Sequence, residues 1–176
     1  MSAVRGSRRA CVAALCAWLV AVAGQEAQTA PPGAVAIAGD VKHELVVDAE
    51  ALRAYPADAQ VSFRAERQIN GQPQQGSVVK GVRLIALLEQ AGLAARDRND
   101  WRRTVVVAIA RDGYRAVFSW PELSNTAGGA QAMVGYERDG APLADGPLVV
   151  LAPADTRTGP RHVKLLQRIE VRILRD

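Results

Sequence analysis

Cysteine is nearly absent from this 176-residue chain, and none lies beyond position 16. The two cysteines, Cys11 and Cys16, both fall in an N-terminal stretch that has the features of a removable leader. A chain without that stretch has no thiol, which excludes a disulfide, a thiolate metal ligand and a cysteine nucleophile. Any mechanism for the remaining chain must work without sulfur nucleophiles.

Histidine is also scarce, and the usual nucleotide-binding and hydrolase motifs are missing. The chain has two histidines, His43 and His162, and neither has a second ligand at helical or hairpin spacing, which excludes a dedicated zinc centre. It has no phosphate loop, dinucleotide fingerprint or nucleophile elbow. A hydrolase built on Asp112 or His162 has no supporting constellation. We therefore assign no catalytic residue and no metal ligand from the sequence.

The chain lacks a strong excess of one charge in the part expected to fold. Its formal net charge is +4, and Arg5, Arg8 and Arg9 contribute three of these charges. Residues 24–176 carry 19 basic against 18 acidic residues, a charge near +1. A nucleic-acid-binding domain would keep a basic excess there, so we expect no nucleic-acid partner. No apolar run outside the leader approaches the roughly 20 residues needed to cross a bilayer.

Residues 1–23 have the order of a secretory signal peptide. Three arginines precede the uncharged stretch Ala10–Ala23, which ends in Ala21-Val22-Ala23. The stretch is 14 residues long, too short for a comfortable membrane-spanning helix, so an uncleaved anchor is the weaker alternative. A second cleavage position follows Ala30. We expect an exported protein, periplasmic or secreted, with no stable membrane anchor after cleavage.

The export route stays open between two systems. Arg8 and Arg9 partly resemble the pair of a twin-arginine signal, which exports proteins already folded. The large apolar residue that usually follows two places later is absent. The general secretory route and the twin-arginine route are both compatible with this leader.

The remaining chain predicts one α+β domain that is mostly β. Residues 24–34 are polar and proline-containing and predict a disordered lead-in, and residues 35–176 form the domain. Short alternating or β-branched runs predict a mixed or barrel-like sheet with a few short helices. Predicted strands are 35–37, 44–47, 61–65, 78–82, 104–110, 114–118, 132–137, 148–151 and 168–173. Residues 68–76 predict a loop and residues 96–103 a solvated connection.

The clearest helix is predicted over residues 84–91. Its apolar residues fall at positions i, i+3, i+4 and i+7, which are Leu84, Leu87, Leu88 and Ala91. Gly92 follows where a helix favours a residue free to adopt positive φ. Asp48 and Ser119 are predicted to cap two shorter helical segments.

A basic loop, residues 153–164, is the strongest candidate for binding. It follows an apolar strand and gathers Arg157, Arg161, His162 and Lys164 around Gly159. Backbone N–H groups near a glycine, together with guanidinium and ammonium groups, favour an anion or phosphate cradle. An ordinary basic surface loop is the alternative that the segment alone leaves open.

Five short motifs follow one another along the chain. They are Lys80-Gly81-Val82-Arg83-Leu84 running into Gly92-Leu93, Val105–Tyr114, Asp139–Leu143, Gly146–Pro153 and Arg168–Val171. Each motif is weak alone, but their shared order resembles a known family, the oxidoreductase molybdopterin-binding domain of the sulfite oxidase type. The resemblance covers roughly residues 35–173.

The resemblance implies a fold and a cofactor. The fold is mostly β, mixed α+β, around a molybdenum pyranopterin dithiolene. In this family the loop after the Gly-Pro-Leu strand lies near the cofactor, with basic residues reaching its phosphate. That maps the cofactor-binding residues onto Arg157, Gly159, Arg161, His162 and Lys164.

The chain departs from the family at the metal. Catalytic members bind molybdenum through a cysteine thiolate in the loop near Glu66–Asn70, where this chain has Arg67, Gln68 and Ile69. Arginine and glutamine do not replace a soft thiolate ligand. The chain is also far shorter than the two-domain enzymes and lacks their dimerisation domain, so their activity does not transfer by analogy.

Two functions follow, and the sequence leaves open whether the chain is an enzyme. One is an exported molybdopterin-binding protein, a component of a molybdenum-dependent oxidoreductase in which the dithiolene alone holds the metal and a redox protein is the partner. The other is a non-enzymatic periplasmic module that has lost the cofactor and binds another anionic small molecule or a protein.

Overall fold

The computed structural model describes most of the predicted domain. It describes residues 30–64, 67–69, 72–74, 76–144, 146–157 and 159–175, and for 67–69 and 72–74 the backbone alone. The predicted signal peptide and most of the predicted lead-in, residues 1–29, lie outside the described residues. No helix in the described part of the chain has the length and apolar character to cross a membrane.

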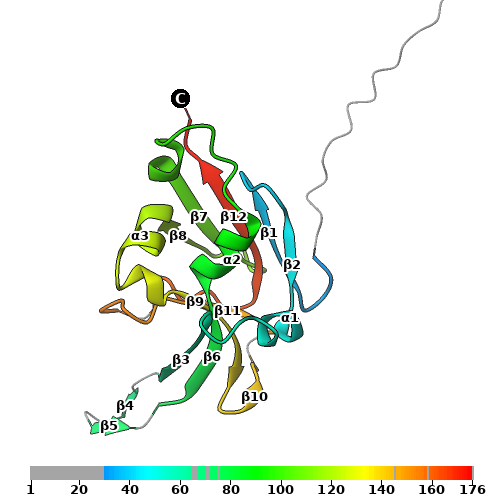
Figure 1. Ribbon diagram of the computed structural model, residues 1–176. Helices are drawn as coiled ribbons and strands as arrows, with labels where there is room; N and C mark the ends of the chain where they lie inside the picture. Colours follow the sequence, from blue (N-terminus) through cyan, green and yellow to red (C-terminus); the bar gives the residue numbers. More distant parts are fainter. Residues whose placement is uncertain are drawn as a thin grey trace, which may run out of the picture.

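The first sheet is mixed and has the order β2-β1-β12-β7-β8. The last strand of the chain pairs in parallel with the first, and the other neighbours are antiparallel. Figure 1 shows this sheet in the upper half of the molecule. Its strands are β1 (Val35–Gly39), β2 (Leu45–Val47), β7 (Thr104–Ala110), β8 (Arg115–Ser119) and β12 (Leu166–Ile173).

The second sheet is antiparallel and has the order β10-β9-β6-β3, with β11 also paired to β9. It lies in the lower half of Figure 1. Its strands are β3 (Gln60–Arg64), β6 (Val78–Arg83), β9 (Met133–Arg138), β10 (Ala141–Pro142) and β11 (Val149–Leu151).

The helices are short, and α2 and the caps Asp48 and Ser119 lie where the sequence predicts them. The four apolar positions of α2 are all fully buried, and Gly92 ends the helix at φ +67°. Asp48 accepts a hydrogen bond from the Ala51 N–H at 2.8 Å, and Ser119 accepts one from Glu122 at 3.2 Å. The helices are α1 (Ala49–Arg53), α2 (Leu84–Ala91), α3 (Trp120–Asn125) and the 3₁₀ turns η1 (Asp100–Arg103) and η2 (Gly129–Gln131).

The core forms two layers because strand side chains alternate between faces. Val134 and Val150 belong to the main cluster with α2 and the inner face of the first sheet. Their neighbours Met133 and Val149 point the other way, into a smaller cluster that Val61 and Phe63 flank. The second sheet is therefore buried on both faces around β9 and β11.

The predicted fold class is confirmed. The described chain is mostly β with mixed sheets and a few short helices. The described strands form separate sheets and no closed barrel, so the barrel-like part of the prediction is wrong.

One predicted loop contains strands. Within residues 68–76, β4 (Arg67–Ile69) pairs antiparallel with β5 (Gln72–Gln74) to form a two-stranded ribbon. Pro73 lies opposite Gln68, where a two-stranded ribbon tolerates a residue that donates no hydrogen bond. Proline and glycine in this segment are typical of loops, so the sequence did not predict the strand pairing. The ribbon projects at the lower left of Figure 1.

The segment 96–103 is also more ordered than a solvated connection. Asp100 begins η1 and has a side chain only 2% exposed. It accepts a hydrogen bond from the Arg96 N–H at 2.8 Å and contacts Arg103 and Arg175 at 3.1 and 3.5 Å. These bonds lower the pKa of Asp100, the Arg96 N–H most of all. A buried carboxylate needs such partners, which a charge-rich sequence alone does not reveal.

We expect Gly81→Ala to destabilise the protein by about 2 kcal/mol, in the range for overpacked sites. A Cβ on Gly81 would lie 2.3 Å from the Val134 carbonyl oxygen and 2.8 Å from the Gly135 Cα, both backbone atoms across the sheet. Urea unfolding measures the loss. Gly159→Ala is the control, because a Cβ there meets nothing within 4 Å. Equal stability of the Gly81 variant and the parent would contradict the close approach.

Candidate binding site

The basic loop leaves β11 and returns to β12, and its base is closed by backbone bonds. Val150 and Val163 exchange hydrogen bonds of 2.9 and 3.0 Å, and the Leu166 N–H donates to Leu148 at 3.1 Å. At the far side of the loop, the Tyr114 hydroxyl donates to the Pro160 carbonyl at 2.6 Å. Both ends and one edge of the loop are therefore fixed to the two sheets.

Arg161 is the internal anchor of this loop. Its Nε donates to Asp155 Oδ2 at 2.8 Å, its Nη2 donates to Asp155 Oδ1, and its Nη1 donates to Glu122 Oε1 at 2.6 Å. The guanidinium also lies over the Phe118 ring, 4.8 Å from its centre. Bidentate pairing and stacking of this kind use the planar geometry that arginine alone supplies.

The electrostatics show that the charge of Arg161 is already balanced. Its hydrogen bonds with Asp155 hold the pKa of that carboxyl below its usual range and raise the pKa of Arg161. Two carboxylates surround one guanidinium, so the cluster carries no positive excess. In this arrangement Arg161 shapes the loop and does not offer a vacant cation to a phosphate.

The other predicted cradle residues lie nearer the surface. Arg157, Gly159 and Lys164 are exposed, and His162 is half-buried. The His162 N–H donates to the Gly159 carbonyl at 3.1 Å, which makes a tight turn at the glycine. An anion cradle on this loop therefore depends on Arg157, Lys164 and backbone groups, and the role of these residues toward a ligand stays a prediction.

A pocket of about 220 Å³ lies where the start of the loop meets β3. Pro153 lines it from the loop, and Ser62 and Phe63 line it from β3, directly before the segment where the family carries its cysteine. Arg83, at the junction of β6 and α2, and Gln131 complete its polar lining. The residues that the resemblance maps to the cofactor, Arg157, Gly159, Arg161, His162 and Lys164, are not among the residues that line this pocket.

The wall opposite β3 is fixed by a close approach of backbone segments. A Cβ on Gly129 would lie 2.2 Å from the Glu122 carbonyl oxygen, and a Cβ on Gly128 would lie 3.3 Å from Ala154 Cβ. Thr126 Oγ1 donates to the Glu122 carbonyl and accepts from the Gly129 N–H, both at 2.9 Å. The segment after α3 and the basic loop therefore pack against each other at the pocket.

The pocket offers no set of metal ligands. Nowhere in the described part of the chain do three histidine, cysteine, aspartate or glutamate side chains gather closely enough to bind a metal ion. Glu66 and Asn70, at the expected ligand loop, lie outside the described residues, and only the backbone of β4 is described between them. The residues present do not fit a protein-held molybdenum, so we derive no step through that metal.

Sequence reasoning missed three polar residues of this pocket: Ser62, Arg83 and Gln131. Arg83 belongs to the motif Lys80–Leu84 that carries part of the family resemblance. The motif gives no reason to expect its side chain in a pocket. Ser62 alternates with apolar neighbours on β3 and looks like an ordinary solvent-facing strand residue. Gln131 belongs to no element or motif that the sequence predicts.

Comparisons with known proteins support the fold and no more. No protein family model matches the chain, and no curated protein matches it. The crystal structure of the sulfane dehydrogenase SoxCD from Paracoccus pantotrophus matches with a TM-score of 0.58 and 19% sequence identity. The match covers 80% of this chain and 38% of that chain. The fold is sulfite oxidase-like.

The sulfite oxidase-like fold places the candidate site without fixing its activity. At 19% identity the similarity extends to backbone architecture, and functional residues are not inherited with a fold. The matched region spans 38% of the neighbour's chain, and an activity of the whole neighbour does not extend to a part of it.

We expect Arg161→Gln to destabilise the protein by about 1–3 kcal/mol, since it leaves the partly buried Asp155 and Glu122 carboxylates without their shared cation. The loss is measured by urea unfolding at pH 7. Arg157→Gln is the matched control, because Arg157 is exposed on the same loop. Equal losses in the two variants would show that Arg161 does not anchor the loop.

The ion pair of Arg161 with Asp155 predicts that part of the unfolding free energy is lost at acidic pH. The pKa of Asp155 is lowered in the folded protein, so its stabilising effect is complete above its unfolded pKa of about 3.9 and is lost as the pH falls through the folded value. The difference in unfolding free energy between the parent and Asp155→Asn should be constant from pH 8 to 5 and shrink below about pH 4.

Chemical denaturation across that pH range measures this difference, with Asp58→Asn as the control because Asp58 is exposed. A parent-to-variant difference that stays constant down to pH 2 would contradict the pairing.

Proposed function

We propose that this protein is an exported binding domain on a molybdopterin-type scaffold that holds a pterin-type ligand without a protein bond to metal. The observation that carries the proposal is the pocket between β3 and the basic loop. It lies beside the start of the basic loop, and polar groups from β3, from Arg83 and from Gln131 line it together with apolar side chains.

The lining of the pocket suits a flat heteroaromatic ring. Phe63, Met133 and Pro153 supply apolar surface, and Ser62 and Gln131 supply hydrogen-bonding groups. A pterin has two apolar faces and an edge of donors and acceptors, so these groups complement it. Among the described lining residues, Arg83 alone is ionisable, and a guanidinium favours a carbonyl or anionic oxygen on the ligand.

The size of the pocket favours a ring over a complete molybdenum cofactor. Cofactor sites commonly enclose roughly 300–1,000 Å³. The described residues enclose about 220 Å³. That volume accommodates a bicyclic ring more readily than a tricyclic pterin with its dithiolene, metal and phosphate. Arg161 is bound to Asp155 and Glu122, which removes one of the cations expected for a phosphate.

Export belongs to this proposal and rests on residues 1–23. A leader with three arginines and an apolar stretch supports an address in the periplasm or outside the cell. Free pterins or a partner protein would reach the domain there.

A redox component is the second candidate. The structural neighbour is a sulfane dehydrogenase, and the match covers 38% of its chain. On that basis the chain would hold molybdopterin through the basic loop, with the dithiolene as the metal's support, and act with a redox protein partner. The observation against it is the poor fit of the described residues to the metal-bearing part of the cofactor.

We expect protein purified from the periplasm of a host that makes molybdopterin to contain less than one molybdenum per ten chains and to bind neopterin reversibly. Elemental analysis measures the metal, and pterin fluorescence measures binding. Arg83→Gln should weaken neopterin binding about tenfold, the cost of a hydrogen bond to a charged group. Arg98→Gln, on an exposed position away from the pocket, is the control.

The other outcomes separate the candidates. One molybdenum and one oxidisable pterin per chain would overturn the proposal in favour of the redox component. No bound pterin together with no neopterin binding would overturn both. In that case phosphate and sulfate titrations of the double variant Arg157→Ala, Lys164→Ala against the parent would test the module that binds other anions.

A further inference from the structure

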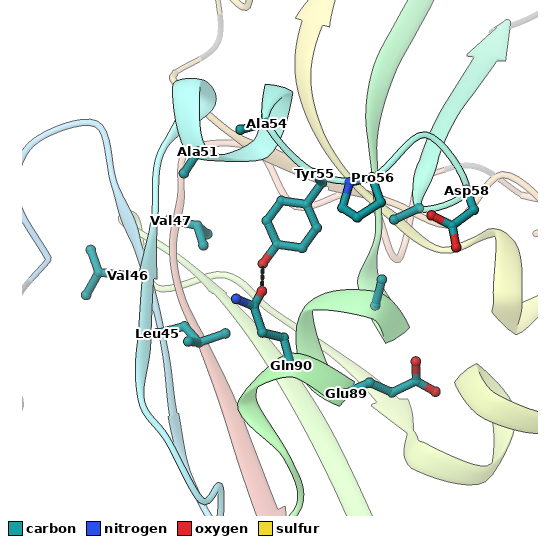
Figure 2. Close-up of a pocket in the computed structure, with 12 residues that line it drawn as sticks. Leu45, Val46, Val47, Ala51, Ala54, Tyr55, Pro56, Asp58, Glu89 and Gln90 are labelled. Carbon is teal, nitrogen blue, oxygen red and sulfur yellow. Dashed lines mark hydrogen bonds between the residues drawn. The ribbon is translucent and has the colours of Figure 1, made fainter.

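A second pocket, of about 700 Å³, lies between β2, α1 and α2. It shares no described lining residue with the pocket beside the basic loop. Its volume falls within the roughly 300–1,000 Å³ that small-molecule sites usually enclose. Figure 2 shows β2 at the left of the pocket, α1 above and α2 below.

The boundaries of this pocket favour a small molecule over a peptide. All three residues of the edge strand β2 line it, although neighbouring side chains point to opposite faces, so the pocket follows the strand's open edge. The N–H groups of Lys42 and His43, just before β2, donate to Gly92 and Ala91 at the end of α2. Directly after β2, Asp48 caps α1. An added peptide strand would meet α2 at one end and α1 at the other.

The wall opposite β2 is apolar with one aromatic ring. Tyr55 projects from the end of α1 into the middle of the pocket, and its hydroxyl donates to Gln90 Oε1 on α2 (Figure 2). Burial raises the pKa of Tyr55, which keeps the phenol neutral. Pro56 and Ala86 extend the apolar surface on either side. The ring therefore offers its face and edge to a molecule lying along β2.

The charges on the rim are all of one sign. Asp58 and Glu89 line the pocket, and none of its described lining residues is basic. The arginine of α1 is turned away, because Arg53 lies 3.9 Å from Glu137 and 5.1 Å from the centre of the Tyr136 ring. Two carboxylates and an aromatic ring around apolar surface form the surroundings that favour an organic ammonium group.

We propose that this pocket is a ligand site for a small organic cation with an apolar body, an amine or quaternary ammonium compound. The apolar body packs against Tyr55 and extends toward β2, and the cationic group lies toward Asp58 and Glu89, on the side of Tyr55 away from β2 in Figure 2. The proposal does not rest on the pterin site, which has a basic lining residue and a different position in the fold.

The test compares three probes of similar shape and different charge: phenethylammonium, 2-phenylethanol and 3-phenylpropanoate. Each is titrated into ¹⁵N-labelled full-length protein, and the amide shifts locate binding. We expect phenethylammonium to shift amides of β2, α1 and α2, to bind about fivefold tighter than 2-phenylethanol and to bind far tighter than the anion.

Two variants separate charge from shape. The double variant Asp58→Asn, Glu89→Gln should weaken phenethylammonium about fivefold and leave 2-phenylethanol unchanged, since two exposed carboxylates contribute modestly each. Ala86→Leu should weaken binding of both by narrowing the pocket on its α2 side, with preserved amide dispersion as the check of folding. Glu50→Gln is the control, because Glu50 is an exposed acid of α1 outside the lining.

The proposal is overturned if the alcohol binds as tightly as the amine, or if the double variant retains full affinity for the amine. It is also overturned if the shifts map to the pocket lined by Arg83 and Pro153. Because neopterin binding is measured separately, failure here leaves the pterin result unaffected.

Discussion

The central place of the last strand is the constraint on which the rest of the structure depends. β12 lies between β1 and β7, so the first sheet is complete only when the C-terminal residues are in place. The connection from β11 must therefore cross from the second sheet to the middle of the first. That crossing is the basic loop, and its fixed ends explain why a segment rich in turn residues has a defined shape.

The arrangement of the loop separates two uses of basic side chains. Arg161 points inward, where Asp155, Glu122 and the Phe118 ring hold it, and so it joins the loop to β8 and α3. Arg83, which comes from a different part of the chain, lines the adjacent pocket. One arginine thus anchors the loop and another lines the pocket that begins at Pro153, while Asp58 and Glu89 line the second pocket.

Local sequence patterns predicted the fold well, but they did not predict contacts between residues that are distant in the sequence. The spacing of Leu84, Leu87 and Leu88 fixed α2 because a 3.6-residue repeat needs no partner to be recognised. The ribbon β4–β5 was not predicted because proline and glycine are typical of loops, and the composition of a segment does not show which other segment it pairs with. The basic loop was located, but its anchoring could not be, since Glu122 lies 39 positions from Arg161. No sequence pattern marked Gln131 and Ser62 as pocket residues, because which side chains line a pocket depends on how the sheets pack.

The parallel pairing of β1 with β12 also decides how the domain responds to force. β1 starts at Val35 and β12 ends at Ile173, at opposite ends of two strands that run side by side in the same direction. Tension applied between the ends of the chain is directed along both strands and loads their hydrogen bonds in shear, all at once. Opposing tension on an antiparallel hairpin opens its bonds one by one. A domain attached at both ends, to a surface and to a partner, would thus resist mechanical unfolding along this axis.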